Sequence, residues 1–540
     1  MGPFDPLFLD PQRIRYEDPF VLFVDKHPGE TVLDAEGGAD LRRAVERYLR
    51  DRGESLGGAF PQLDRPSSGL VLFSKQKAQN GSWAALMEGG DLQRRYAARL
   101  PERIAGPIEG LEIDSDEWPH VSLRLGSLRP SSLRRTLAKH GLPLVGDREL
   151  GGQPAFRLML HLAQLAFVHP VTKERTVVDA GPPRFAEDGD VLELLLASLA
   201  RRRAVSAAVG SKGGCRIVHG SGDGCPGIEI DRYGSALVVA THAGRTSRAP
   251  AEVVVALKTL GASRIYQKKR QRKASSVQQK DLQTLAPKAP VHGELPAEGE
   301  SVEVELAGHR FQWPLRLGGE WSTGVFFDQR DNWSRVAGRA SGARVLNLFA
   351  YTGAFTVAAV LGGAKASTTV DAAAPALEEA RRRIDQAARL AGAPSANHRV
   401  VRADVFAYLR DTDERFDLVV VDPPTYSTTS QSRWRSGGDW TELLRGLLPR
   451  LAPRTVVYCC SNDRRMGPGA FQRRLEAALH PSVFEIARSR RYPPPDDFPP
   501  APKRGGHLKT IELALSQRSD ATPSEGTGRR ARRRRRSGRQ

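Results

Sequence analysis

The sequence predicts a multidomain protein that combines α/β and α+β units, and three observations point to this fold class. The chain has 540 residues, which is enough for three or four domains of ordinary size. Residues 344–427 alternate apolar strand-like runs with helical runs, as is typical of a doubly wound parallel sheet. Residues 13–75 read instead as strands and one helix separated by charged turns, which indicates a mixed α+β unit.

The parallel-sheet region opens with a strand, a glycine turn, a helix, a second strand and an acidic residue. In chain order these are Val345–Phe349, the turn residues Tyr351, Thr352 and Gly353, the helix Ala354–Leu361, the strand Ala366–Val370 and Asp371. A glycine turn lets the backbone approach a ligand, and an acid after the second strand accepts hydrogen bonds from ribose hydroxyls. We therefore expect an adenosine-bearing cofactor. Dehydrogenases use the same logic, but their turn is G-x-G-x-x-G and this one is YTGAF.

A second acidic motif follows the fourth expected strand, Phe416–Val421. It reads Asp422-Pro423-Pro424-Thr425-Tyr426. Two prolines stiffen the backbone and donate no hydrogen bonds, so they leave a carboxylate and carbonyls beside an aromatic residue. Such a site can hold a planar base and accept hydrogens from its exocyclic amine. Asp404, after the third strand, is placed to accept from an adenine amine.

These motifs, with STGVFFDQRDN at 322–332, resemble class I S-adenosylmethionine-dependent methyltransferases of the bacterial large-subunit ribosomal RNA group. That group carries D-P-P-x-[FY] and T-G-x-F-L-D-x-R. The resemblance implies a seven-stranded, doubly wound, Rossmann-like domain at 311–515. It implies that S-adenosyl-L-methionine contacts Phe349, Tyr351, Thr352, Gly353, Asp371, Asp404, Asp328 and Arg330. It also implies that Asp422, Pro423, Pro424 and Tyr426 position the target base.

Residues 1–200 carry a different set of motifs. These are FPQLDRPSSGLVLFSK, LQRRYAARL, SLRRTLAKHGLPLVGD and LHLAQLAFVHP, in that order. They resemble the RluA family of pseudouridine synthases, with its H-R-L-D-x-x-[TS]-S-G and L-H-A-x-x-L-x-F-x-H-P segments. The resemblance implies a pseudouridine synthase-like domain that isomerises uridine in RNA.

The resemblance also assigns roles to three side chains of this unit. Asp64 would attack the flipped nucleotide, Arg134 would hold that carboxylate ionised and oriented, and Tyr96 would stack on the base or move a proton. The family's His-Arg before Leu-Asp is Pro61-Gln62 here, so the arginine expected to help flip the base is missing. Weak or absent isomerase activity is therefore expected, with the unit serving as an RNA clamp.

A small α+β module is expected at 213–310, after a linker at 201–212. Its CRIVHGSGDGCPGIEIDRYG run resembles the D-x-x-P-G-[IL]-x-[VI]-D-R-Y-G segment that precedes the catalytic domain in the same methyltransferase group. The basic run KKRQRKASS, at 268–276, is interpreted as a loop that contacts phosphates without reading sequence.

The charge of the chain favours a polyanionic partner, most simply ribosomal RNA. Net charge is +19, and residues 516–540 contribute +7 of it through nine arginines, one Asp and one Glu. This tail cannot bury a core, so we expect a disordered RNA tether.

Cysteine and hydropathy patterns indicate the compartment. The four cysteines include no C-x-x-C pair, so no zinc or other metal site is expected, and the low count fits a reducing cytoplasm. The N-terminus does not read as a signal peptide, and no apolar run approaches 18 residues, so no membrane span is expected.

The product depends on how Tyr458–Arg465 is aligned. In the cytosine-methylating members a cysteine at this strand end is the nucleophile, a role that would fall to Cys460. The rival alignment matches Ser461–Arg465 to the S-N-N-x-R segment of guanine-methylating members, and we favour it. A buried cysteine is also a common packing residue.

The sequence thus predicts a cytoplasmic methyltransferase that acts on a base of large-subunit ribosomal RNA. One alternative is a bifunctional enzyme that also forms pseudouridine. Another is a methyltransferase with a protein or small-molecule substrate, which the basic tail and the RNA-enzyme-like first unit argue against.

Overall fold

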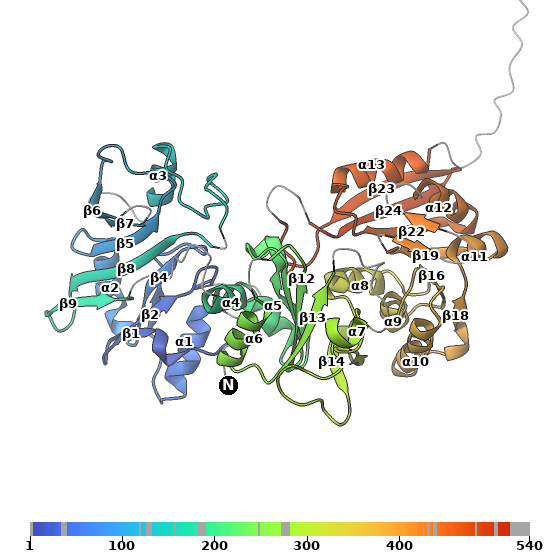
Figure 1. Cartoon of the computed structure of the whole chain (residues 1–540), viewed down its shortest axis with the longest axis horizontal. Coiled ribbons are helices and arrows are strands. Elements are labelled where there is room, and N and C mark those ends of the chain that lie inside the picture. Colours follow the sequence, from blue (N-terminus) through green and yellow to red (C-terminus); the bar gives the residue numbers. More distant parts are fainter. Residues whose placement is uncertain are drawn as a thin grey trace, which may run out of the picture.

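The computed structural model arranges the chain as three units in a row (Figure 1). It describes residues 4–33, 40–117, 120–125, 132–155, 157–181, 191–246, 249–271, 281–424, 426–428, 433–435, 440–480, 483–501 and 506–518. The expected phosphate-contacting residues 272–276 and almost all of the basic tail, 519–540, lie outside these ranges. The described part of the chain contains no helix that is both long and apolar enough to cross a membrane.

The N-terminal unit is a mixed sheet with three helices around it. Its described strands are β1 Ile14–Glu17, β2 Val21–Lys26, β3 Gly58–Phe60, β4 Ser68–Ser74, β5 Gln93–Arg99, β6 Leu111–Glu117, β7 His120–Leu125, β8 Leu160–Val168 and β9 Arg175–Asp179. Its helices are α1 Leu41–Arg50, α2 Asn80–Glu88 and α3 Leu133–Lys139. The strands run in the order β1-β2-β4-β8-β5-β7-β6, with β3 on β4 and β9 on β8. The parallel β4–β8 pair joins the two antiparallel halves of this sheet.

The middle unit has a four-stranded sheet in the order β10-β11-β12-β13. Its elements are α4 Val191–Arg201, α5 Arg203–Val209, β10 Gly214–His219, β11 Ile228–Tyr233, β12 Ala236–His242, α6 Pro250–Thr259, β13 Arg264–Arg270 and α7 Leu282–Leu285. The expected linker at 201–212 is wrong, because most of it is helical. Leucines of α4 share a hydrophobic core with β10–β13 and with Val145 and Met159 of the N-terminal unit.

Two further expectations about this region are corrected. The boundary at 310/311 cuts through a single antiparallel hairpin, β14 Glu300–Leu306 with β15 His309–Leu315. Lys268 lies within β13 instead of in a loop, and its side chain is buried with Nζ donating to the carbonyl of Trp321 at 3.3 Å. The basic residues at the start of that run therefore include one that faces the protein interior.

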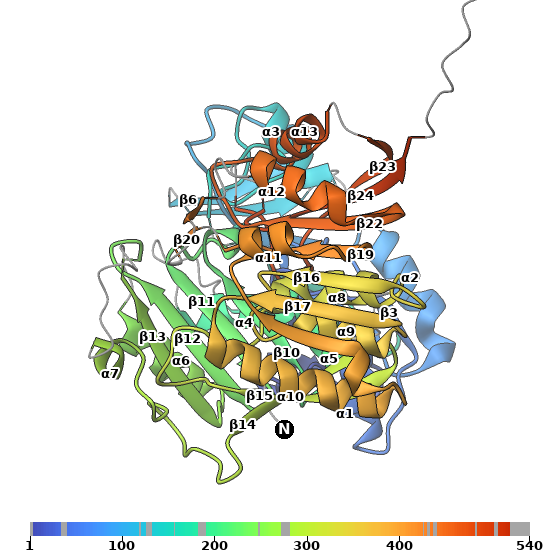
Figure 2. The same ribbon diagram turned by 90° about the vertical axis from the view of Figure 1, so that its right-hand side faces the viewer.

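The third unit is a seven-stranded doubly wound sheet, as expected (Figure 2). Its strands are β16 Arg344–Leu348, β17 Ala366–Asp371, β18 His398–Arg402, β19 Phe416–Val421, β22 Leu451–Ser461, β23 Phe484–Tyr492 and β24 Lys509–Gln517, and a short hairpin adds β20 Tyr426–Thr428 and β21 Arg433–Arg435. The order is β18-β17-β16-β19-β22-β24-β23, and β24 is antiparallel to both neighbours.

Helices cover both faces of this sheet. One core joins the sheet to α8 Arg330–Ala337, α9 Ala354–Leu361 and α10 Ala374–Leu390. The opposite core joins it to α11 Val405–Asp411, α12 Trp440–Leu447 and α13 Pro468–Ala478. Both faces of the parallel strands are therefore covered by helices and shielded from solvent. The carboxyl ends of the strands form the edge of the sheet where a ligand can bind.

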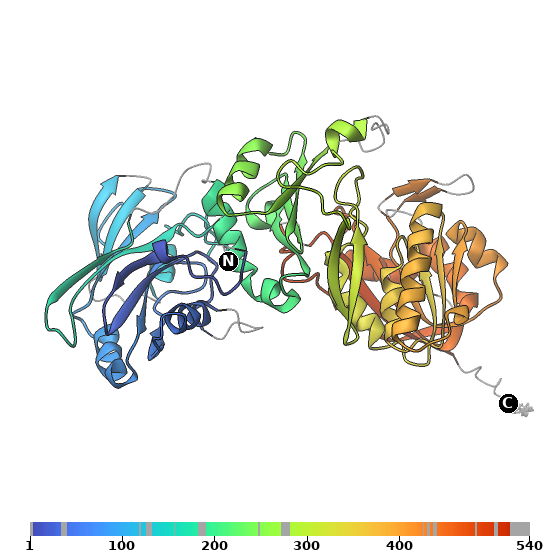
Figure 3. The same cartoon turned by 90° about the horizontal axis from the view of Figure 1, so that it is seen from below.

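The Pro-rich segment between β23 and β24 returns from the third unit to the middle one (Figures 1 and 3). Asp497 in this segment is fully buried and accepts from the backbone N–H of Arg216 at 2.8 Å and from the guanidinium of Arg330 at 2.5 Å. Its carbonyl accepts from Arg202 at 3.0 Å. One residue therefore ties the junction between α4 and α5, β10 and α8 together.

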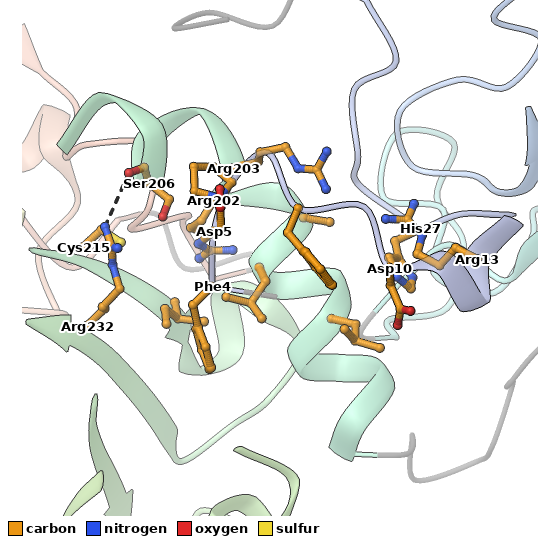
Figure 4. A pocket seen from close by; sticks show the side chains of 16 residues that line it. Phe4, Asp5, Asp10, Arg13, His27, Arg202, Arg203, Ser206, Cys215 and Arg232 are labelled. Atoms are coloured by element: carbon orange, nitrogen blue, oxygen red, sulfur yellow. Dashed lines mark hydrogen bonds between the residues drawn. The ribbon is translucent and has the colours of Figure 1, made fainter. Parts of the chain in front are cut away.

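A small cavity of about 70 Å³ lies where the N-terminal and middle units meet, and Figure 4 shows the side chains that line it. Residues 4–10 lie against α4, α5 and β10 there, and Asp5 pairs with Arg47 of α1 at 3.0 Å. Arg202 at this junction donates to both oxygens of Asp223, each at 2.6 Å. The charges around the cavity are thus largely paired within the protein.

Candidate functional site

A cavity of about 810 Å³ opens at the carboxyl ends of β16, β17, β18 and β19. Among its lining residues are Phe326, Asp328, Gln329, Phe349, Tyr351, Thr352, Asp371, Asp404, Phe406, Asp422, Pro423, Pro424, Trp434 and Asn462. Ligands of open α/β sheets bind at this edge, because the loops after parallel strands meet there. The cavity therefore brings together most of the cofactor and base residues that the motifs predict.

The turn after β16 has an unusual backbone. Phe349 and Tyr351 have positive φ values of 57° and 51°, a conformation that non-glycine residues rarely adopt. Gly353 follows with φ 81°, and an added Cβ there would lie 3.0 Å from Cβ of Ala380 in α10. Glycine is thus required by conformation and by helix packing. Strained backbone at the end of a central strand is typical of ligand sites.

Asp371 ends β17 and holds this turn. Its Oδ2 accepts from the backbone N–H of Tyr351 at 2.8 Å, and its Oδ1 accepts from that of Ala373 at 2.9 Å. Each carboxylate oxygen can accept a second hydrogen bond, so both oxygens keep capacity for a ligand. Asp371 therefore shapes the turn as well as lining the cavity.

Asp404 lines the cavity and also caps α11. Its Oδ1 accepts from the backbone N–H groups of Phe406 and Ala407, at 3.0 and 3.2 Å. The buried ring of Trp434 lines the same cavity, and its centroid is 5.5 Å from that of Phe349. The Trp434 indole donates to the carbonyl of Pro424 at 2.7 Å, which fixes the Pro-Pro turn. Aromatic faces next to a carboxylate suit a purine ring with an exocyclic amine.

Asp422 has the most perturbed carboxyl group at the site. Burial and the nearby charge of Asp328 raise its pKa to about 7, and a hydrogen bond from Gln329 opposes that rise. Gln329 Nε2 donates to Asp422 Oδ2 at 2.9 Å. Among the described residues no hydrogen-bond donor faces Oδ1. The carboxyl therefore changes charge near neutral pH and presents one oxygen to the cavity.

Asp328 and Arg330 of the same motif point in different directions. Asp328 lines the cavity, and its Oδ2 lies 2.9 Å from Nε2 of His507. Arg330 does not line the cavity, and the expectation that it contacts the cofactor is wrong. Its guanidinium donates instead to the carbonyl of Gly214 at 2.9 Å and to Asp497.

Cys460 is fully buried and is absent from the cavity lining. Its Sγ lies 3.8 Å from Gln329 Oε1 and 3.7 Å from Thr510 Oγ1. Burial, and then the charge of Asp422, raise the pKa of this thiol well above its ordinary value. A neutral, enclosed thiol does not fit the role of nucleophile.

Asn462 is a lining residue that the motif analysis did not place in the site. It follows β22, whose Cys459 pairs with Val421 of β19, so Asn462 and Asp422 lie at the ends of neighbouring parallel strands. The Asn462 Oδ1 is buried and lacks a hydrogen-bond partner among the described residues. The match of Ser461–Arg465 to the S-N-N-x-R segment was the sequence feature that could have placed Asn462 in the site.

Tyr426, which was expected to help position the target base, lies in β20, which pairs with β21.

A second, larger cavity of about 1430 Å³ lies in the N-terminal unit. Asp64, Tyr96 and Arg134 all line it, although they come from a turn, from β5 and from α3. The Arg134 guanidinium donates to Asp64, and it is held by Asp147 at 2.8 and 2.9 Å and by Glu149 at 3.0 Å. The three expected side chains thus share one cavity.

The turn that carries Asp64 rests on a buried lysine. Lys26 Nζ donates to the carbonyls of His27, Arg65 and Ser67, at 3.1, 3.0 and 2.5 Å. Burial lowers the pKa of Lys26 to about 7, while Glu30 and Asp64 oppose this. Gln62, at the position of the family's flipping arginine, uses Nε2 to donate to the carbonyl of Leu70 at 3.0 Å.

Residues 286–510 match the model of a family described as S-adenosylmethionine-dependent methyltransferases. The residues before 286 lie outside that match. The matched range contains β14 to β23, the first two residues of β24 and every residue that lines the cavity at the sheet edge.

Two named relatives show how far the likeness extends. A Deinococcus radiodurans protein named "Ribosomal RNA large subunit methyltransferase" is 32% identical over 324 residues, covering 57% of this chain and 74% of that protein. A Klebsiella pneumoniae protein named "Ribosomal RNA large subunit methyltransferase I" is 36% identical over 264 residues, covering 48% of this chain and 62% of that protein.

A solved structure shares the fold. The crystal structure of SMU.776 complexed with SAH has a TM-score of 0.51 and 21% sequence identity, and the match covers 71% of this chain and 98% of that one.

Proposed function

Because the chain belongs to the S-adenosylmethionine-dependent methyltransferase family that includes the ribosomal RNA large subunit methyltransferases, we propose that it methylates a base of large-subunit ribosomal RNA. The observation that carries this proposal is the cavity at the sheet edge, where four carboxylates and the Pro-Pro turn meet. S-adenosylmethionine supplies an already activated methyl group, so the protein contributes binding and orientation.

The lining of the cavity fits the cofactor. Asp371 accepts from the ribose hydroxyls, and Asp404 accepts from the adenine amine beside Phe406. Tyr351 and Thr352 also line the cavity, where the positive-φ turn brings backbone to the ligand. The two carboxylates are hydrogen-bond acceptors, which suits the donor groups of an adenosine, namely its ribose hydroxyls and its adenine amine.

A guanine nitrogen is the target that the cavity favours. Asp422 Oδ1 and Asn462 Oδ1, which has no hydrogen-bond partner among the described residues, are two acceptors at adjacent strand ends. The pairing edge of guanine offers two donor groups, the ring N–H and the exocyclic amine, whereas cytosine offers only its amine. Phe326 stands at the cavity rim, 52% exposed and 5.7 Å from the Tyr351 ring, where an extruded base can stack. Buried Cys460 weighs against 5-methylcytosine, which needs a thiolate.

The test is methylation of unmodified large-subunit ribosomal RNA by the purified full chain. The enzyme and S-adenosylmethionine are incubated with the RNA, and the nucleosides are separated and weighed by mass spectrometry. A methylguanosine is the expected product. A 5-methylcytidine would reverse the base assignment, and transfer only to protein or small molecules would refute the RNA assignment.

For residues 1–200 we propose a pseudouridine synthase-like unit that binds the same RNA. The Asp64–Arg134 pair supports this, because a charge-paired Asp that shares a cavity with a buried Tyr96 matches the family's motif roles. The alternative is a bifunctional enzyme. Chemical mapping of pseudouridine on the same RNA separates the two, since only the bifunctional reading gives an Asp64-dependent signal.

A further inference from the structure

A chain of three side chains leads along α8 to Asp422. Gln329, Asn332 and Arg335 are spaced three residues apart, so they lie on one face of the helix. Arg335 Nη1 donates to Asn332 Oδ1 at 2.8 Å, Asn332 Nδ2 donates to Gln329 Oε1 at 2.6 Å, and Gln329 Nε2 donates to Asp422 Oδ2 at 2.9 Å. Asn332 and Gln329 are both buried.

The direction of every hydrogen bond in this chain is fixed by chemistry. A guanidinium only donates, so it must face the oxygen of Asn332. The Asn332 amide nitrogen then faces Gln329 and must meet its oxygen, and it also donates to Thr510 Oγ1 at 2.8 Å. Gln329 is left with its nitrogen toward Asp422. Two amides whose orientation is otherwise ambiguous are thus set by one arginine.

We propose that Gln329, Asn332 and Arg335 form a positioning relay that keeps Oδ2 of Asp422 occupied and reserves Oδ1 for the hydrogen of the target base. This inference rests on the proposed methylation of a base in the cavity. The three residues act through Asp422 and are positioning residues, because the relay carries no atom that reacts.

The relay decides where a proton binds on Asp422. Oδ2 already accepts from Gln329, so protonation falls on Oδ1, which then donates toward the base and blocks its amine. The titratable groups near the carboxyl are Asp328, which pairs with His507, and the buried Cys460 thiol. With the pKa of Asp422 at about 7, methyl transfer rises as pH increases through neutrality. Without the Gln329 donor that rise moves to higher pH, because the donor stabilises the carboxylate.

The experiment compares pH profiles of methyl transfer for three variants of the full chain. Gln329→Met keeps the side-chain length and removes the donor. Asn332→Asp keeps the pairing with Arg335 and removes the donor to Gln329, so the Gln329 amide can reverse. Gln164→Met is the matched control, because Gln164 donates to Asp179 at 3.2 Å on the N-terminal unit.

We expect the acidic limb of the pH profile of kcat to shift to higher pH by about one to two units in Gln329→Met and by less in Asn332→Asp. At about pH 9 both variants should recover the wild-type rate. Gln164→Met keeps the wild-type profile. If both relay variants lose activity at every pH with an unmoved limb, the residues are only structural and the proposal is overturned.

A second readout needs no substrate, and so it separates failure of this inference from failure of the proposed function. The pKa of Asp422 is followed by NMR of protein labelled with 13C at the aspartate carboxyl, with Asp422→Asn to assign the signal. Gln329→Met should raise that pKa whether or not ribosomal RNA is the substrate. An unchanged pKa would overturn the relay, even in a chain that methylates ribosomal RNA.

Discussion

The two large cavities each present an aspartate, and their surroundings give the two carboxyl groups opposite character. Asp64 in the N-terminal unit is paired with Arg134, which Asp147 and Glu149 hold in place. Asp422 in the methyltransferase unit meets a neutral amide and another acid, and its pKa rises to about 7. A cation faces the first carboxylate, whereas burial and a neighbouring acid make the second change charge near neutrality. The partner, and not the residue type, decides which chemistry an aspartate can support.

Of the changes that test this difference between the two aspartates, removing Asp422 should have the largest effect on the rate of methyl transfer. Asp422→Ala deletes the acceptor for the target base and is expected to lower kcat for methyl transfer about 100-fold or more. Asp64→Ala should leave that rate unchanged. Initial rates with tritiated S-adenosylmethionine measure both, and calorimetry of cofactor binding checks that each variant folds. Equal losses in the two variants would mean that the cavities are not independent.

Asp371→Ala should weaken cofactor binding about tenfold or more. The carboxylate is expected to accept from the ribose, and it also anchors the backbone of Tyr351. Asp413→Ala is the matched control, since Asp413 is fully exposed and pairs with Arg450. Isothermal calorimetry with S-adenosylmethionine gives the Kd values. An unchanged affinity in Asp371→Ala would remove Asp371 from the cofactor site.

Cys460→Ala should change the rate of methyl transfer by less than about threefold. The buried thiol packs against Gln329 and Thr510, and its loss is expected to lower the free energy of unfolding by about 1 kcal/mol. Rate measurements and urea denaturation test the two effects separately. Abolished transfer in a folded variant, together with 5-methylcytidine from the wild type, would make Cys460 the nucleophile.

The N-terminal cavity should form pseudouridine only in trace amounts. Its carboxylate and arginine are assembled, but Gln62 is bonded to the backbone of Leu70 and replaces a side chain expected to extrude the base. Chemical mapping after incubation with ribosomal RNA measures the product. A strong signal that disappears in Asp64→Ala would show that the two cavities are both catalytic.

The methyltransferase fold could be predicted from local signals. Helix Ala354–Leu361 and strand Phe416–Val421 were expected with the bounds that the structure has. Residues 201–212 were misread because three arginines and small residues resemble a linker. Their charges are satisfied by Asp223 and Glu30, which are distant in sequence, and that pairing allows the segment to be helical.

The acidic residues of the site could be predicted because they follow the ends of strands. The residues whose position depends on contacts distant in sequence could not. Asp371, Asp404 and Asp422 line the cavity because parallel strands end at one edge. Arg330 was misassigned because its partner, Asp497, lies 167 residues away. The role of Gln329 was missed because only the folded helix places its amide against Asp422. Single-sequence motifs identify acids at turns and do not reveal which side chains orient them.

The buried Asp497 has a consequence for how the protein is made on the ribosome. Its partner Arg216 lies 281 residues earlier in the chain. At about 5–20 residues per second, synthesis needs about 14–56 s to cover that separation. During that interval the middle unit has emerged, yet the carboxylate that meets Arg216 and Arg330 has not been made. The contact of Asp497 with the middle unit therefore forms only after most of the methyltransferase domain has been translated.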